Sequence, residues 1–181
     1  MLYMFFADGF EEVEAIATLD VIRRAGIEIK SVGVGNKTVT GSHNISVICD
    51  MTTDELVYNA EDVDGMILPG GMPGTTNLMN NFFVESFIDS CYSDKKLICA
   101  ICAAPMILGR KGLLKNKEAV CFPGFEDELK DAVLSDKFVC NSDGIITAKG
   151  MGSAIDFGLE IVSELIDKET AVKLKSTLQC S

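Results

Sequence analysis

The stretch LICAICAAPM, residues 97–106, decides how the middle of this chain folds. Residues 97–101 are apolar and uncharged, which predicts a buried strand, and the small residues after them lead into Met106 and a helix. Cys102 is therefore expected in a strand-to-helix turn. A nucleophile in such a turn needs small residues two positions away on each side, as in Gly-x-Ser-x-Gly, and Ala100 and Ala104 occupy those positions.

Cys102 has two interpretations at this point. The amides at a helix start favour a thiolate, but they lower a cysteine pKa of ~8.5 by only about one unit, so a reactive thiol needs a second group. That group is ordinarily a histidine, and the single histidine, His43, lies in a polar turn far upstream. Cys102 is thus either a reactive thiol with another partner or an inert buried cysteine.

Apolar strands alternate with helical segments along the chain. This alternation predicts an α/β fold, with a doubly wound, mostly parallel sheet and helices on both faces, in a single domain of residues 1–181. Strands are expected at residues 2–7, 27–34, 64–68, 97–101, 138–140 and 144–148, a hairpin at 38–48, and a strand and turn at 119–124. Helices are expected at residues 9–25, 53–59, 82–93, 105–108 and 152–165.

The first helix is expected to contain one acid among apolar residues. Asp8 is the predicted N-cap, and Glu11 takes the capping-box position three residues later. The apolar positions form a wide stripe, which predicts burial on more than one side: Val13, Ile16, Ala17, Leu19, Val21 and Ile22. Glu14 lies among them. It is either a buried acid that needs a partner or a proton, or an exposed acid that stabilises the helix dipole.

Two glycines follow the strand at residues 64–68. Gly70 and Gly71 come after Pro69, at the carboxyl end of an expected parallel strand, where ligands bind in open α/β sheets. Any strand can end in Gly-Gly. As a functional feature, however, these amides are candidates for an oxyanion hole together with the amide of Ala103.

Composition limits the kind of protein. With 181 residues, 48% hydrophobic residues and no long uncharged run, the chain can bury a core and is not expected to span a membrane. A net charge of −11 disfavours direct binding to nucleic acid. Seven scattered cysteines and the absence of a signal-peptide pattern indicate a reducing compartment, the cytoplasm.

Cys99 and Cys102 form a C-x-x-C pair. Zinc would normally need a second pair at similar spacing, and the sequence contains none, so no metal site is expected. A thioredoxin-type pair lies in the turn and the first helical turn, whereas Cys99 falls inside the expected strand. Cys99 is therefore interpreted as a core residue.

Three separated motifs resemble, in order and spacing, those of the ThiJ/PfpI superfamily. They are DGFEEVE at residues 8–14, LPGG at residues 68–71 and AICAAP at residues 100–105. Within the superfamily, the chain is most similar to the branch of the parkinsonism-associated deglycase. The likeness covers nearly the whole chain, including residues 20–26 and 150–154.

This resemblance implies a flavodoxin-like architecture, shared with class I glutamine amidotransferase domains, and a site without a cofactor or metal. It implies that Cys102 is the reactive cysteine, that Glu14 hydrogen-bonds it, and that the amides of Gly70, Gly71 and Ala103 face the site. An ionised Glu14 would repel a thiolate and raise the pKa of the thiol strongly. We therefore expect a protonated Glu14 beside a Cys102 thiolate, with the two groups titrating as a coupled pair.

The chain departs from parts of the superfamily. The related peptidases carry a histidine directly after the nucleophile, where this chain has Ala103, so peptidase activity is not expected. Glutamine amidotransferase domains need a downstream histidine, and none follows His43. Phe122 stands where many close relatives have a histidine, and Asn44 where an arginine enters from a dimer partner. The resemblance also implies a homodimer, built partly on the first helix and residues 45–49.

Three functions are compatible with these residues. The first is a cofactor-free glyoxalase or deglycase, in which the Cys102 thiolate attacks methylglyoxal-type carbonyls and Glu14 transfers protons. The second is a redox sensor or oxidative-stress protein, in which Cys102 is oxidised to sulfenic or sulfinic acid and Cys121 is a candidate resolving thiol. The third is a non-enzymatic, chaperone-like dimer.

Overall fold

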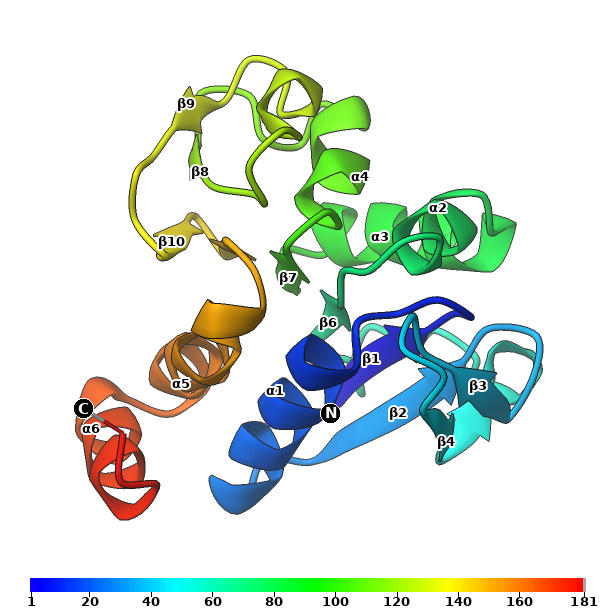
Figure 1. Cartoon of the computed structure of the whole chain (residues 1–181), viewed down its shortest axis with the longest axis horizontal. Helices are drawn as coiled ribbons and strands as arrows, with labels where there is room; N and C mark the ends of the chain where they lie inside the picture. Colours follow the sequence, from blue (N-terminus) through cyan, green and yellow to red (C-terminus); the bar gives the residue numbers. More distant parts are fainter. Residues whose placement is uncertain (181) are drawn as a thin grey trace.

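The computed structural model describes residues 1–180, and most of their strands form one sheet covered by helices (Figure 1). The main sheet contains β1 (Leu2–Phe6), β2 (Ile29–Gly33), β5 (Met51–Thr52), β6 (Gly65–Leu68), β7 (Leu97–Ile101), β10 (Val139–Ser142) and β11 (Ile145–Ala148). Two smaller sheets pair β3 (Thr38–Thr40) with β4 (Ser46–Ile48) and β8 (Glu118–Ala119) with β9 (Val133–Leu134). The hairpin expected at residues 38–48 is therefore confirmed.

The main sheet is doubly wound. Its spatial order is β10-β11-β7-β6-β1-β2-β5, and within residues 1–180 the strands pair in parallel except for β10, which runs antiparallel to β11. From β1 the chain moves outward to β2 and β5, and it then returns to β6 on the other side of β1. The order of the strands therefore reverses between β1 and β6, which is where ligands bind in such sheets.

Helices cover both faces of the sheet, as predicted. They are α1 (Glu12–Arg24), α2 (Gly74–Met79), α3 (Phe82–Ser93), α4 (Pro105–Arg110), α5 (Ala154–Leu165) and α6 (Lys168–Thr177), with the 3-10 helices η1 (Thr53–Glu55), η2 (Glu126–Glu128) and η3 (Met151–Ser153). Helices α2, α3 and α4 lie on one face, whereas α1 and α5 lie on the other, with α6 packed outside α5 (Figure 1).

Strand β1 shows why the core has two layers. Successive side chains of a strand point to opposite faces, so a strand in the middle of such a sheet must be apolar at every position. All of β1 is buried. Tyr3 and Phe5 pack on the α3 side, where both rings meet Phe87 edge-on, and Met4 and Phe6 pack on the side of α1 and α5.

Two expected elements are shorter than predicted. The helix expected at residues 53–59 is only the single turn of η1. The Glu55 carboxylate accepts hydrogen bonds from the N–H and the hydroxyl of Thr52, and Leu56 then continues as extended chain with its side chain buried. The strand expected near Ala119 does not join the main sheet, since β8 pairs with β9. Helices α2 and α6 were not predicted.

The apolar stripe of α1 is only partly buried. Val13 and Ile16 are 47% and 42% exposed, whereas Val21 and Ile22 are buried against α5 and the sheet. Helix α1 is therefore buried on the sides that face the sheet and α5, but Val13 and Ile16 of the stripe are exposed in the single chain. Among the described residues, no helix has the length and apolar character needed to cross a membrane.

The core is expected to be sensitive to the loss of Phe5, which is fully buried between β1 and α3. Truncation of a buried phenylalanine leaves a cavity, so Phe5→Ala should lower the free energy of unfolding by ~3–5 kcal/mol. Phe82→Ala is the matched control, because this ring is 82% exposed and its loss should change stability by less than ~0.5 kcal/mol. Urea unfolding at fixed protein concentration measures both, and equal losses would contradict this description of the core.

Candidate active site

The candidate residues meet at the carboxyl ends of three adjacent strands, at the point where the strand order reverses. Glu14 comes from α1, which follows β1. Gly70 and Gly71 follow β6, and Cys102 and Ala103 follow β7. Residues that are far apart in the sequence are therefore brought to one edge of the sheet.

Cys102 lies in the predicted strand-to-helix turn. Its φ angle is +65°, a left-handed conformation that is uncommon for a residue with a side chain. Backbone hydrogen bonds hold it there: its N–H donates to the carbonyl of Ala148 at 2.9 Å, and its carbonyl accepts from the N–H of Phe122 at 2.8 Å. Ala103 and Ala104 are buried directly behind it, which explains the need for small residues. The Cys102 side chain is half-buried.

Glu14 is a buried acid and not an exposed one. Only 1% of its surface is accessible, although it lies in the first turn of α1. The N–H of Gly70 donates to its Oε2 atom at 3.0 Å, and the N–H of Met151 and the thiol of Cys102 also hydrogen-bond the carboxyl group. The structure therefore brings the Glu14 carboxyl and the Cys102 thiol together at this edge of the sheet.

The two glycines make this contact sterically possible. A Cβ atom on Gly70 would lie 2.5 Å from both the Cβ of Cys102 and the Oε2 of Glu14, so any side chain there would separate them. Gly71 has φ +90°, and a Cβ there would collide with the backbone of Glu11. A side chain at position 70 would have no space. A side chain at position 71 would also have no space, and it would in addition need a left-handed backbone conformation that favours glycine.

The three expected amides have different partners. Those of Gly71 and Ala103 hydrogen-bond the sulfur of Cys102, which lowers the pKa of the thiol. The amide of Gly70 is occupied by Glu14. Two of the three amides therefore act on the sulfur of Cys102, and the third bonds the carboxyl of Glu14.

Burial dominates the ionisation of both side chains. It raises the pKa of Glu14 from 4.5 to about 7, even though hydrogen bonds from Cys102 and Gly70 oppose the change. Burial, and then the charge of Glu14, raise the pKa of the Cys102 thiol to about 12. The expected increase for Glu14 agrees with the structure. The expected thiolate does not agree with the structure, because burial and the nearby Glu14 carboxylate raise the pKa of the Cys102 thiol more than the two amides lower it.

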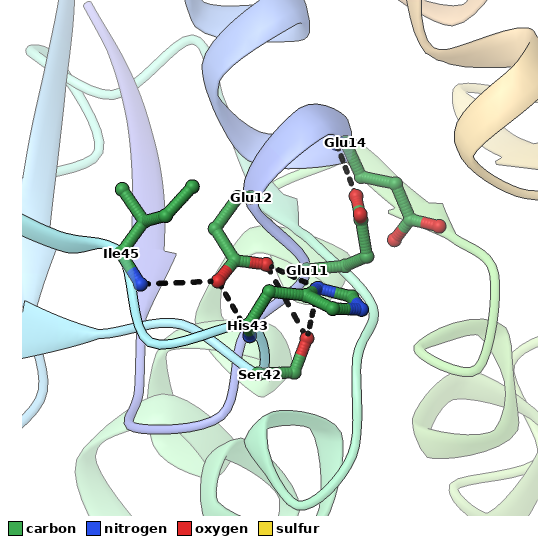
Figure 2. Close-up of polar contacts among 6 residues, drawn as sticks. All are labelled: Glu11, Glu12, Glu14, Ser42, His43 and Ile45. Carbon is green, nitrogen blue, oxygen red and sulfur yellow. Dashed lines mark hydrogen bonds and ion pairs between the residues drawn. The ribbon is translucent and has the colours of Figure 1, made fainter.

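The start of α1 differs from the prediction. Glu11 is the N-cap, because its carboxylate accepts the N–H of Glu14 at 2.6 Å, as Figure 2 shows. Asp8 instead accepts the N–H of Thr40 at 2.8 Å and fixes the β3 strand beside the site. The capping-box interpretation of Asp8 and Glu11 is therefore wrong.

A second buried acid, Glu12, lies two residues before Glu14 and points to the other side of the helix start, where it holds the loop before β4 (Figure 2). It accepts hydrogen bonds from the backbone N–H of His43 at 2.6 Å, from the His43 ring Nδ1 at 2.8 Å and, at 3.5 Å, from the N–H of Ile45. Burial disfavours the charge on Glu12, but these hydrogen bonds outweigh it and hold its pKa at about 2. No pattern in the sequence predicted this pair.

Within residues 1–180, Glu11, Glu12 and His43 are the one group of three residues with metal-ligand atoms close together, all within 4.8 Å. Their carboxylates are already used as the helix cap and as the acceptor for His43. His43 is thus a partner of Glu12, in agreement with the expectation that it is not the base for Cys102.

Comparisons with known proteins place this site in a family. The chain matches the sequence profile of the DJ-1/PfpI family over residues 1–164. It is 33% identical over 175 residues to Protein DJ-1 homolog B of Arabidopsis thaliana, covering 95% of this chain but only 40% of that protein. It is also 32% identical over 126 residues to a deglycase of Pyrococcus horikoshii, covering 70% of this chain and 74% of that one.

A solved structure supports the same assignment. The structure described as oxidized DJ-1 of Toxoplasma gondii superposes with a TM-score of 0.93 at 31% sequence identity, covering 99% of this chain and 98% of that one. The flavodoxin-like α/β fold expected from the sequence is thus also the fold of this relative. The profile match and the structural match each cover well over half of the chain, and the chain therefore belongs to the DJ-1/PfpI family.

Proposed function

We propose that this chain is a cofactor-free glyoxalase or deglycase that acts on small reactive carbonyls of the methylglyoxal type. One observation carries the proposal: the buried carboxyl of Glu14 contacts the thiol of Cys102, and its pKa of about 7 suits proton transfer at neutral pH. The relative in Pyrococcus horikoshii that is named a deglycase supports the same class of reaction.

The first step is attack by sulfur. Above pH ~7, Glu14 is a carboxylate, and it takes the proton of the Cys102 thiol as the sulfur bonds to the aldehyde carbon. The product is a hemithioacetal whose oxygen has gained negative charge. The amides of Gly71 and Ala103, which act on the sulfur, are the proposed donors to this oxygen and stabilise its charge.

The second step moves a hydrogen within the substrate. Glu14 first returns the thiol proton to the charged oxygen of the hemithioacetal and so becomes a carboxylate again. It then removes the proton from the former aldehyde carbon, which gives an enediol, and delivers this proton to the neighbouring carbon, while the hydroxyl proton of the first carbon moves to the oxygen of the second. The result is a thioester of lactate, which water hydrolyses to lactate and a free thiol. One carbon is oxidised and its neighbour reduced, so no external oxidant or cofactor is needed.

Oxidation of Cys102 is the alternative function. The thiol is half-buried, whereas Cys121, the candidate resolving thiol, is only 3% exposed. The Toxoplasma gondii relative is described as oxidized, which shows that oxidised forms occur among similar proteins. The non-enzymatic dimer is the third possibility, and under it substitutions at Cys102 and Glu14 would leave the function unchanged.

We also propose that the chain forms a homodimer through the surface that the resemblance implies, the first helix and residues 45–49. Val13 and Ile16 on α1 and Ile45 before β4 line an exposed apolar groove of about 440 Å³. Exposed apolar groups that gather on one face indicate an interface, and a second copy of the chain would cover them. Asn44 lies in the same loop, at the edge of this groove.

Turnover of methylglyoxal to lactate tests the enzyme proposal. Cys102→Ser should reduce turnover to background, and Glu14→Gln should reduce kcat by ~10²–10⁴-fold because it removes the proton acceptor. Cys180→Ser is the matched control, since it removes another partly exposed cysteine far from the site. If wild-type protein shows no turnover while peroxide still oxidises Cys102, the redox function replaces this proposal.

The pH dependence of turnover tests the role of Glu14. The active form needs the carboxylate, so kcat/KM should rise about tenfold per pH unit below pH 7 and level off above it. A carboxyl group with the ordinary pKa of 4.5 would give a flat profile from pH 6 to 9. Steady-state assays from pH 5 to 9 distinguish the two profiles.

The proposed dimer predicts that Ile16→Glu converts the protein to a monomer, because a charge would be buried in the apolar groove. Light scattering coupled to size-exclusion chromatography measures the mass. Val172→Glu is the control, because this residue is 60% exposed on α6, outside the groove. A monomeric wild type, or a dimer that survives Ile16→Glu, would argue against this interface.

A further inference from the structure

A small apolar pocket of about 260 Å³ lies beside the candidate active site. Three segments form it: residues 122–123 after β8, Phe138 before β10, and residues 149–153 between β11 and α5. Its walls are almost entirely apolar. Nothing in the reaction of a carbonyl as small as methylglyoxal requires such a pocket.

The pocket concentrates exposed apolar surface. Phe122, Phe138 and Met151 are 47%, 67% and 54% exposed, and all three border the same hollow. The ammonium group of Lys149 lies 5.5 Å from the centre of the Phe138 ring and helps to hold that ring in place. Exposed apolar groups around a hollow favour an apolar ligand, because binding removes their surface from water.

The pocket adjoins the reacting groups through Gly150. A Cβ atom on Gly150 would lie 3.1 Å from the Phe122 ring and 3.8 Å from the Oε1 of Glu14, so this glycine adjoins both the pocket wall and the acid. Phe122 is also bonded through its N–H to the carbonyl of Cys102. The turn that carries Cys102 is therefore bonded directly to a residue of the pocket wall.

The volume indicates what fits. Pockets that hold a whole drug-sized molecule occupy ~300–1,000 Å³, so this one suits a single apolar group such as an aromatic ring. It shares no residue with the groove at Val13, Ile16 and Ile45, so it is distinct from the proposed dimer surface.

We infer that the pocket formed by Phe122, Phe138 and Met151 binds the side group of the substrate, so that this chain prefers aromatic 2-oxoaldehydes to methylglyoxal. This inference rests on the proposed function and specifies its substrate class. With phenylglyoxal, the sulfur of Cys102 bonds to the aldehyde carbon while the phenyl ring enters the pocket. Hydrogen transfer to the ketone carbon and hydrolysis of the thioester then give mandelate and the free thiol, without an external oxidant or reductant.

The first experiment compares kcat/KM for phenylglyoxal and methylglyoxal. Wild-type protein should favour phenylglyoxal by at least about tenfold, since burial of an apolar group of this size is worth that much discrimination. Phe138→Ala should remove most of the preference by raising KM for phenylglyoxal, and it should leave methylglyoxal turnover within about twofold. Phe82→Ala is the matched control, because it removes an exposed phenylalanine from α3, on the opposite face of the sheet.

A second readout does not depend on turnover. Mass spectrometry gives the rates at which iodoacetamide and its aromatic counterpart iodoacetanilide alkylate Cys102. The ratio of the aromatic to the small reagent should fall in Phe138→Ala and Phe122→Ala, and it should stay unchanged in Phe82→Ala. Equal ratios in all four proteins would overturn the inference, as would equal kcat/KM for the two carbonyls. Loss of turnover for both carbonyls with the alkylation pattern intact would refute the proposed function but not the aromatic pocket.

Discussion

Burial of the Glu14 carboxyl is the constraint on which the rest of the site depends. A carboxyl group removed from water needs hydrogen-bond partners or a proton, and three loops supply them here. The amide of Gly70 comes from the loop after β6, the thiol of Cys102 from the turn after β7, and the amide of Met151 from the segment before α5. The parallel sheet matters because it brings these loops to one edge.

Close backbone approach is the second requirement. Gly70 lies between the acid and the thiol and leaves no room for a side chain, and the left-handed turn at Cys102 is held by hydrogen bonds to Ala148 and Phe122. The rim is less constrained. Phe122 contributes an apolar side chain there and no group that can carry a proton, so the proposed acid–base chemistry rests on Glu14.

The sequence predicted what local patterns determine. The central strands were recognised because buried strands are apolar throughout, and the turn at Cys102 because its small neighbours are close in sequence. Contacts between distant residues were not predicted: Asp8 bonds Thr40 and so does not cap α1. Helix α6 was not predicted, because Ala171 is its one buried residue. The buried contact of Glu14 came from the family resemblance, and the raised pKa of the Cys102 thiol could not be predicted, because it depends on the depth of burial.

The raised pKa of Glu14 affects the whole fold as well as the site. In the unfolded chain this carboxyl releases its proton near pH 4.5, whereas the folded protein holds it up to about pH 7. Between these values the folded state binds more protons than the unfolded state, so the contribution of Glu14 to the free energy of unfolding falls as pH rises. Above pH 7, where Glu14 is a carboxylate as the proposed mechanism requires, this contribution is lowest. The pH range in which the proposed chemistry is fastest is thus the range in which Glu14 contributes least to the free energy of unfolding.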